Sequence, residues 1–308
     1  MTAQNPAAAP VARTGSIYDL GYRRYDGPRL GRAYAVRSLI VHSFRTTYGL
    51  GRGGRAKVAP FGLGALAILP AVLVVGALTL AARMGIQREF EGASPISYES
   101  YFSSVGTIIA LFCAAQAPEL FGRDQRHGVL TLYFARALRR SDYALARLLG
   151  FAIALLLLLL FPMAILFLGR GLLSTDIATS FGSDLPKIPA ILGQSLLTAG
   201  LLGGLSMAVS AFSPRRAYAT AGIIALFILP GIIAGIVNQL GSSAIGNWLA
   251  LLSQGTVLSG TNALLFGTSL PDELFFFDLP HWTFLASALA GIALSVGLVV
   301  RRMARIAT

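Results

Sequence analysis

The chain has 308 residues, of which 55% are hydrophobic and only 12% are charged, and its mean hydropathy is +0.69. About a quarter of the residues in soluble globular domains are charged, so this composition excludes that class and predicts an integral membrane protein. A net charge of +12 would suggest nucleic-acid binding in a soluble chain. In a membrane protein we expect it to mark the cytoplasmic side instead, and we predict no nucleic-acid partner. The single cysteine, Cys113, lies in an apolar run, which excludes a disulfide framework.

Residues 1–57 are predicted to form a cytoplasmic tail, because they carry 10 of the 25 Lys and Arg residues. The first 15 residues are rich in Ala and Pro, and we expect them to be disordered. Further along, apolar residues recur at four-residue spacing: Val36, Ile40, Phe44 and Tyr48. This spacing predicts an amphipathic helix at about residues 33–49. Such a helix either lies in the membrane interface or packs on its own protein.

Six apolar intervals are long enough to cross a bilayer, whose ~30 Å core needs roughly 20 residues of helix. They predict transmembrane helices at about residues 58–82, 100–118, 148–169, 188–212, 217–239 and 279–300. The fifth interval is ambiguous, because residues 217–271 contain no charge and could hold either one span or two.

The distribution of basic residues favours one span in this interval. With six spans, 21 of the 25 Lys and Arg residues fall on the side of both termini. A seventh span would place Arg301, Arg302 and Arg305 outside, against the positive-inside rule. We therefore expect an all-α integral membrane protein with six transmembrane helices and both termini cytoplasmic. The expected location is the plasma membrane or bacterial inner membrane.

Residues 248–266 form an apolar segment interrupted by Ser, Thr, Asn, Gln and Gly, which the six-span topology places on the outer face. Irregular backbone at membrane depth survives only where protein or a water-filled cavity covers it. The pattern therefore indicates either a re-entrant external helix pair or a folded cap. Trp248 is suited to anchoring the segment at headgroup depth.

The loop between the second and third spans, residues 118–150, carries six arginines and three acidic residues, which predicts a cytoplasmic position. From Val129 onward, apolar and basic residues at i, i+3, i+4 and i+7 predict a short amphipathic helix over about residues 128–140. This helix is too short to cross a bilayer. It could lie on lipid headgroups or bind another protein.

Residues that would perform catalysis or ion coupling are missing from the predicted spans. Ionisable groups deep in a membrane would mark a proton path, and the span cores have almost none. The chain has no phosphate-binding loop of the form G-x-x-x-x-G-K-[ST], and its three histidines lack metal-ligand spacing. We predict no enzyme activity and no metal or cofactor in this chain, so any energy for transport would come from a partner.

The 118–150 loop contains a recognisable order of residues. It begins with Glu119 and continues through Gly128, the run LYFARALRRSDY at residues 132–143, and Arg147. Together with the predicted topology, this order resembles the permease subunits of type-2 ABC exporters. In that family an acidic residue at the end of span two precedes a Gly, a short helix and a run similar to L-x-R-P-x-S-R-x-x-Y-x-x-x-K. Here Ala137 replaces the family's Pro, and Arg147 stands at the family's Lys.

The resemblance implies that the helix over residues 128–140 is a coupling helix that docks on a separately encoded P-loop ATPase, which would bind ATP and Mg. Leu132 and Tyr133 would supply an apolar plug, and the arginines would supply polar contacts. The implied coupling residues are Glu119, Gly128, Leu132, Tyr133, Arg136, Arg139 and Arg140.

The resemblance also implies an assembly of two permease chains, identical or paralogous, with two copies of the ATPase in a lipid bilayer. Spans two and five would line the transport path between the two chains. The segment over residues 248–266 would act as an external gate, with Trp248, Asn262 and Phe266 as gate residues.

These inferences favour an exporter subunit that moves a hydrophobic or amphipathic cargo. A different class of function stays open, a non-transporting scaffold or assembly protein whose basic face binds anionic lipid. A proton-coupled carrier is disfavoured by the missing acidic residues.

Overall fold

A computed structural model describes most of the chain: residues 27, 30–86, 97–135, 138–174, 176–241, 243–270 and 279–306, without the side chains of 243 and 244. Residues 1–30 and residues 31–308 form two separate units. All the described helices belong to the second unit.

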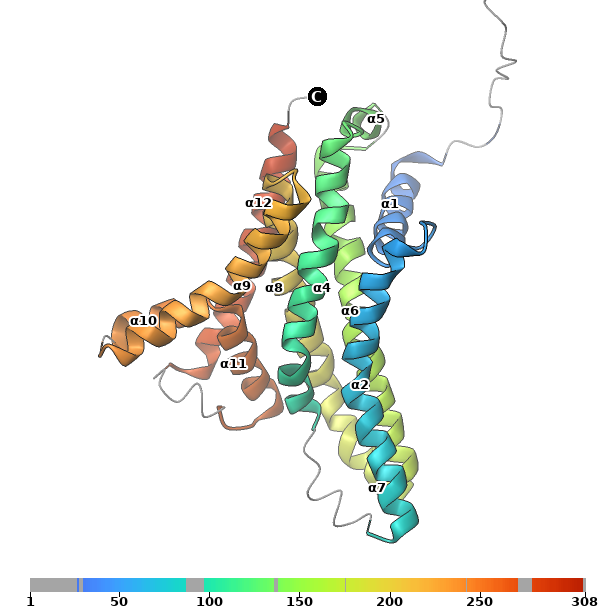
Figure 1. Cartoon of the computed structure of the whole chain (residues 1–308), viewed down its shortest axis with the longest axis vertical. Helices are drawn as coiled ribbons and strands as arrows, with labels where there is room; N and C mark the ends of the chain where they lie inside the picture. Colours follow the sequence, from blue (N-terminus) through green and yellow to red (C-terminus); the bar gives the residue numbers. More distant parts are fainter. Residues whose placement is uncertain are drawn as a thin grey trace, which may run out of the picture. The chain divides into compact units, whose positions relative to one another are not determined.

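Every regular element among the described residues is a helix (Figure 1). In chain order these are α1 (Gly31–Thr47), α2 (Arg55–Met84), α4 (Tyr98–Arg126), α5 (Leu130–Phe134), α6 (Arg140–Leu173), α7 (Ile177–Asp184), the 3-10 turn η1 (Leu185–Lys187), α8 (Ile188–Phe212), α9 (Arg216–Gln239), α10 (Ser243–Ala250), α11 (Gln254–Phe266) and α12 (His281–Arg305). Six helical segments in the described part of the chain are long and apolar enough to cross a membrane: α2, α4, α6, the continuous α7–α8, α9 and α12. Within the described residues, the predictions of an all-helical fold and of six helices long and apolar enough to span a membrane are thereby confirmed.

Two of the spans are much longer than their apolar stretches. Helix α4 has 29 residues and α6 has 34. At about 1.5 Å per residue these helices measure ~44 Å and ~51 Å, compared with a bilayer core of ~30 Å. Helix α4 continues past Pro118 to Arg126, and α6 begins at Arg140 rather than near residue 148. Both helices therefore carry charged residues beyond the apolar core.

Helix α1 packs along α6. Its buried side chains are Leu39, Ser43, Thr46 and Thr47. The predicted apolar stripe flanks this buried row and is only half-buried. Contact is close at Gly150 of α6, where a Cβ atom would lie 2.7 Å from the carbonyl oxygen of Ile40. The predicted helix is thus present two residues earlier than expected and packs on its own protein, while its place in a membrane interface stays a prediction.

Helix α8 lies at the centre of the bundle, in contact with α4, α6, α11 and α12. Small residues permit these contacts: a Cβ atom at Gly200 would lie 2.9 Å from Ile292, and one at Gly203 would lie 2.8 Å from Leu155. Helix α9 differs, because only 11% of its most apolar stretch is buried. Much of the apolar surface of α9 is therefore available to lipid or to another chain.

The predicted external segment contains two helices joined by a short turn at residues 251–253. Helix α10 packs against α9, whereas α11 packs against α12, α8, α4 and α9. The expected helix pair is therefore present, although its first helix begins at Ser243 rather than at Trp248. Its re-entry into the membrane stays a prediction.

Candidate functional site

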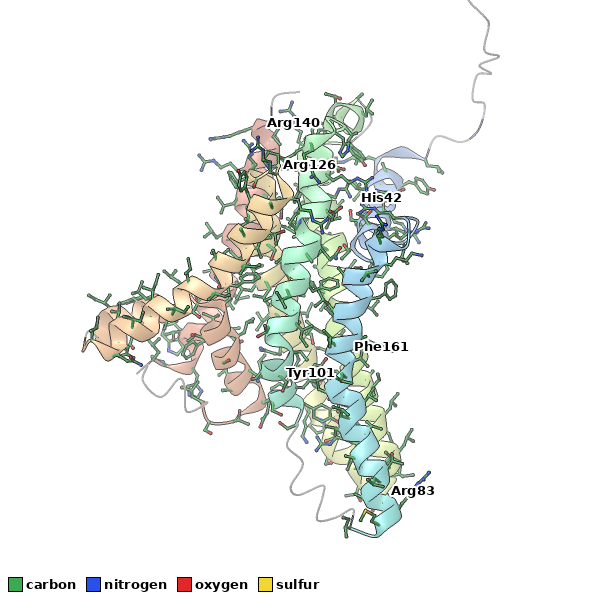
Figure 2. The ribbon with its side chains drawn as sticks, in the orientation of Figure 1. His42, Arg83, Tyr101, Arg126, Arg140 and Phe161 are labelled. Carbon is green, nitrogen blue, oxygen red and sulfur yellow. The ribbon has the colours of Figure 1, made fainter. Side chains whose placement is uncertain are left out.

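Several helix termini meet at the end of the bundle that carries α5, called here the α5 end (Figures 1 and 2). The Nη1 group of Arg140, at the start of α6, donates a hydrogen bond to the carbonyl oxygen of Ala304 in α12 at 2.9 Å. Figure 2 shows Arg126 and Arg140 at this end and Arg83 at the opposite end. The α5 end is the one that the charge distribution predicts to be cytoplasmic.

Glu119 joins three segments at the α5 end. Its carboxylate lies 3.1 Å from Arg52 Nη1 in the loop between α1 and α2, and 2.9 Å from Arg216 Nη1 at the start of α9. The Glu119 side chain is only 16% exposed. The predicted coupling residue is thus the centre of an ion-pair bridge within this chain.

The helix predicted over residues 128–140 is shorter than expected. It spans Leu130–Phe134. Gly128, with φ of +63°, separates it from α4 by adopting the left-handed conformation that glycine tolerates best. Arg139 is the N-cap residue of α6, and Arg140 is the first residue of that helix, so both lie outside α5. Arg136 lies outside the described residues.

Helix α5 is held by aromatic packing on its inner side. Leu130 is buried, the Tyr133 ring lies 5.3 Å from the Tyr143 ring, and Phe134 meets Tyr143 edge-on at 5.8 Å. The guanidinium of Arg140 lies 5.6 Å above the Phe134 ring. Leu132 points away from these contacts and is 68% exposed. Helix α5 is therefore packed against α6 on one side and exposes one large apolar side chain, Leu132, on the other.

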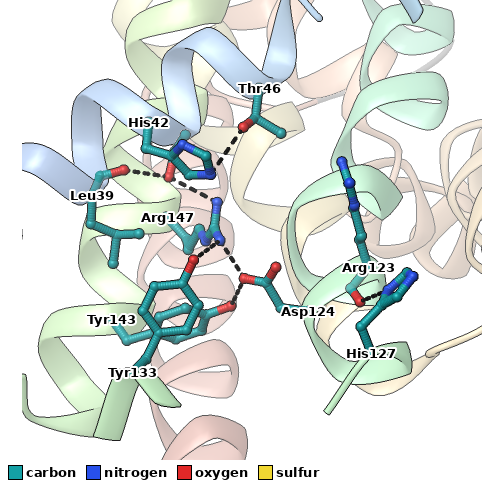
Figure 3. A network of polar contacts seen from close by, with 10 residues as sticks. Leu39, His42, Thr46, Arg123, Asp124, His127, Tyr133, Tyr143 and Arg147 are labelled. Atoms are coloured by element: carbon teal, nitrogen blue, oxygen red, sulfur yellow. Dashed lines mark hydrogen bonds and ion pairs between the residues drawn. The ribbon is translucent and has the colours of Figure 1, made fainter. Parts of the chain in front are cut away.

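Behind α5, a polar cluster surrounds Arg147 of α6 (Figure 3). Its Nη2 group forms an ion pair with Asp124 of α4 and donates to the Tyr133 hydroxyl at 3.4 Å. Its Nη1 group donates to Ser43 Oγ of α1 at 3.3 Å, and the Tyr143 hydroxyl donates to Asp124 at 2.6 Å. We call these five residues the Arg147 cluster. It connects α1, α4, α5 and α6.

Burial of the Arg147 charge carries a desolvation cost that its partners must offset. Arg147 is only 2% exposed, and a buried charge is tolerated only when it is paired and hydrogen-bonded. Its guanidinium also lies 5.8 Å from the Tyr133 ring and 5.4 Å from the Tyr143 ring, at distances where aromatic faces attract cations. Its Nε atom is buried without a hydrogen-bond partner among the described residues.

A cavity of about 920 Å³, called here the α5-end cavity, opens beside the Arg147 cluster. It is bounded by α1, by the loop after α1, by α4 and by α5, with Arg147 and Leu138 completing its wall. Its basic lining residues are His42, Arg52, Arg123, His127 and Arg147, and its acidic ones are Glu119 and Asp124. The cavity is therefore mainly basic.

Desolvation and neighbouring arginines lower the pKa values of two groups in this cavity. The pKa of His42 is lowered, first by desolvation and then by the nearby Arg147 charge. The pKa of the Arg52 guanidinium is also lowered, again by desolvation first and then by Arg123, while Glu119 acts in the opposite direction. Added positive charge is thus disfavoured in this cavity, as expected where basic groups gather.

A second cavity, of about 600 Å³, lies between α4 and α9, the second and fifth spans. Leu202 of α8 and several α11 residues complete its wall. Its polar lining residues are Ser103, Thr107, Gln254 and Ser259, and no charged residue lines it in the described part of the chain. The Oε1 atom of Gln254 is buried and accepts no hydrogen bond from the described residues. This cavity therefore combines apolar walls with neutral hydrogen-bonding groups.

The three residues predicted to form an external gate occupy different surroundings. Asn262 is buried in α11, and its Nδ2 group donates to the Glu99 carbonyl oxygen of α4 at 2.9 Å. Phe266 lies 6.3 Å from the Phe102 ring. Trp248, on α10, is 74% exposed. Asn262 and Phe266 thus fasten α11 to α4, and Trp248 does not take part in that contact.

Sequence reasoning found some of these residues and missed others. It identified Glu119, Gly128, Leu132 and Tyr133, all of which lie at the α5 end. It did not identify Asp124, Ser43 or His42 as members of a site, because their partners come from other helices. One signal was present, since Asp124 and Arg147 are charged residues that flank the apolar runs of consecutive spans.

Comparisons with family models and curated sequences give no family assignment for this chain. No protein-family model matches it, and no curated protein matches its sequence. No group of three or more His, Cys, Asp or Glu side chains that could hold a metal ion occurs among the described residues.

Proposed function

We propose that this chain is the membrane-spanning permease subunit of an ATP-driven exporter of the type-2 ABC kind. A separately encoded P-loop ATPase would bind ATP and Mg and supply the energy. The observation that carries the proposal is α5, an anchored helix between two spans that presents the exposed Leu132. An exposed apolar residue on a firmly packed base is suited to filling a pocket on a partner.

The contacts of α5 explain how motion at a docking surface would reach the membrane. Tyr133 contacts Arg147 and Tyr143 of α6, and both of these residues bond to Asp124 of α4. A partner that displaced α5 would therefore act on the second and third spans together. Glu119 would extend the connection to the fifth span through Arg216.

The cavity between α4 and α9 supports a cargo path along the second and fifth spans. Its apolar walls and neutral polar groups suit a hydrophobic or amphipathic cargo better than an ion. The exposed surface of α9 would face a second permease chain, identical or paralogous, in a unit with two ATPases. In this proposal the protein lies in the plasma membrane, with the α5 end and both termini in the cytoplasm.

Co-purification tests the proposal. The tagged chain is expressed from its native gene neighbourhood, solubilised in detergent and recovered with its partners. We expect a P-loop ATPase to accompany it, and ATP hydrolysis to depend on the chain. Leu132→Asp should reduce the recovered ATPase about 30-fold, because losing a central apolar contact costs an interface about 2 kcal/mol.

The matched control is Leu185→Asp, which makes the same change at a leucine that is 56% exposed in η1, far along the chain from α5. Recovery of the ATPase should equal that of the unaltered chain. A chain that purifies alone and without nucleotide hydrolysis would refute the exporter proposal and favour a scaffold. Normal recovery with Leu132→Asp would move the docking surface away from α5.

A further inference from the structure

We propose that the α5-end cavity binds a phosphate group, carried either by the headgroup of an anionic phospholipid or by a soluble phosphate ester. This inference does not depend on an ATPase partner. It rests on the charge of the cavity, on an unpartnered buried donor and on the position of the cavity along the spans.

The first argument is that the acidic residues of the cavity are already occupied. Glu119 is paired with Arg52 and Arg216, and Asp124 is bonded to Arg147 and Tyr143. Arg123, the remaining arginine of the cavity lining, therefore has no acidic partner among the described residues.

Arg123 is the cation best placed to receive an anion. It is exposed, and its guanidinium forms no hydrogen bond or ion pair with any described residue. Figure 3 shows Arg123 and His127 on the α4 side, across from His42 and Arg147. A guanidinium group can bind phosphate through two parallel hydrogen bonds. A phosphate between the two sides of the cavity could therefore contact Arg123 on one side and Arg147 on the other.

The second argument is the buried, unpartnered Nε atom of Arg147, a residue that lines the same cavity. Buried donors are nearly always hydrogen-bonded, and an unsatisfied one calls for an explanation. A phosphate oxygen in the cavity would provide an acceptor. It would also offset the charges of Arg147 and Arg123, which add to desolvation in lowering the pKa values of His42 and Arg52.

The third argument concerns the apolar part of the cavity. Its wall includes five aliphatic side chains from α1, α5 and the adjoining loops: Leu39, Leu50, Val129, Leu132 and Leu138. Helices α4 and α6 extend beyond the length of a bilayer core, and the cavity lies on their extended ends. A basic cavity with apolar walls at headgroup depth matches the two halves of an anionic phospholipid.

Native mass spectrometry of the full chain in detergent tests the inference with three probes: phosphatidylglycerol, phosphatidylcholine and glycerol 3-phosphate. We expect one phosphatidylglycerol to bind at least about tenfold more tightly than phosphatidylcholine. Arg123→Gln should weaken this binding about tenfold, the effect of losing one charge-assisted hydrogen bond. Binding of glycerol 3-phosphate with the same dependence on Arg123 would support the inference and identify a soluble phosphate ester as the source.

The matched control is Arg126→Gln, which removes the same charge one helical turn along α4 from a residue that does not line the cavity. Its affinity for phosphatidylglycerol should not change. The melting temperature of each variant shows whether the fold is intact, and the Arg123 side chain has no hydrogen bond to a described residue that the change would remove. Equal binding of the two lipids, equal binding by Arg123→Gln and the unaltered chain, or no binding of any anionic probe would overturn the inference.

Discussion

At the scale of single residues, Arg147 is the most constrained side chain at the α5 end. Its guanidinium is buried, and its bonds reach α1, α4 and α5 at once. A buried ion pair contributes little by itself, but removal of one partner leaves the other charge desolvated and unpaired. The cluster therefore fixes how the four helices meet more than it adds to their stability.

Arg147→Met should destabilise the protein by about 3–5 kcal/mol, because it leaves the Asp124 carboxylate buried without its cation. Asp124→Asn should also destabilise the fold by leaving Arg147 unpaired. The double variant should lose less than the sum of the two single losses, because neither charge then remains. Melting temperatures in one detergent measure all three variants, and strictly additive losses would show that the pair is not coupled.

The residue scale is also where sequence reasoning was least informative. The resemblance to the exporter family identified Glu119, which ends an apolar run. Its ion pairs, however, are with Arg52, in the loop before α2, and with Arg216, at the start of α9, which lie 67 and 97 residues away in the chain. Asp124 and Arg147 lie 23 residues apart. No helical periodicity relates positions on two different helices, so only the fold brings such charges together.

At the scale of elements, the contact between α1 and α6 depends on the absence of a side chain at Gly150. A Cβ atom there would lie 2.7 Å from the Ile40 carbonyl oxygen and 2.5 Å from Ser43 Cβ. Because the first of these is backbone, α1 would have to move away from α6. The hydrogen bond from Arg147 to Ser43 would then lengthen.

Gly150→Ala should therefore destabilise the protein by about 1–3 kcal/mol, the usual penalty for overfilling a packed contact. The control is Gly76→Ala in α2, where no atom lies within 4 Å of the new Cβ. That change should leave stability equal or raise it by up to about 1 kcal/mol, since alanine favours a helix more than glycine does. Melting temperatures in detergent distinguish the two, and a stabilising Gly150→Ala would contradict the close contact of α1 with α6.

At this scale the sequence predicts that the six long helices exist, but it does not predict the residues at which they end. Apolar intervals bounded by charges predicted all six spans. The prediction ended the second span at Pro118, whereas α4 continues to Arg126. Charges limit the membrane core but do not stop a helix, because partners such as the Asp124–Arg147 pair can satisfy them beyond the core. Proline is tolerated in membrane helices for a similar reason, since neighbouring groups satisfy the backbone.

At the scale of the whole molecule, charge and fold provide separate constraints on topology. The fold places α5, the start of α6 and the end of α12 together, as the contacts of Arg140 with Phe134 and with Ala304 show. The sequence places 21 of 25 basic residues on that side when six spans are assumed. The fold does not distinguish the two sides of a membrane, so the charge bias alone predicts that the α5 end is cytoplasmic.

Labelling of single cysteines with a membrane-impermeant maleimide tests this orientation. In a Cys113→Ala background, Arg305→Cys places a thiol on an exposed residue at the α5 end, and Ser183→Cys places one on an exposed residue of α7. We expect Ser183→Cys to react in intact cells and Arg305→Cys to react only after permeabilisation. The opposite pattern would place the basic face outside. It would then remove the cytoplasmic ATPase from contact with α5, because a P-loop partner can act only where ATP is present.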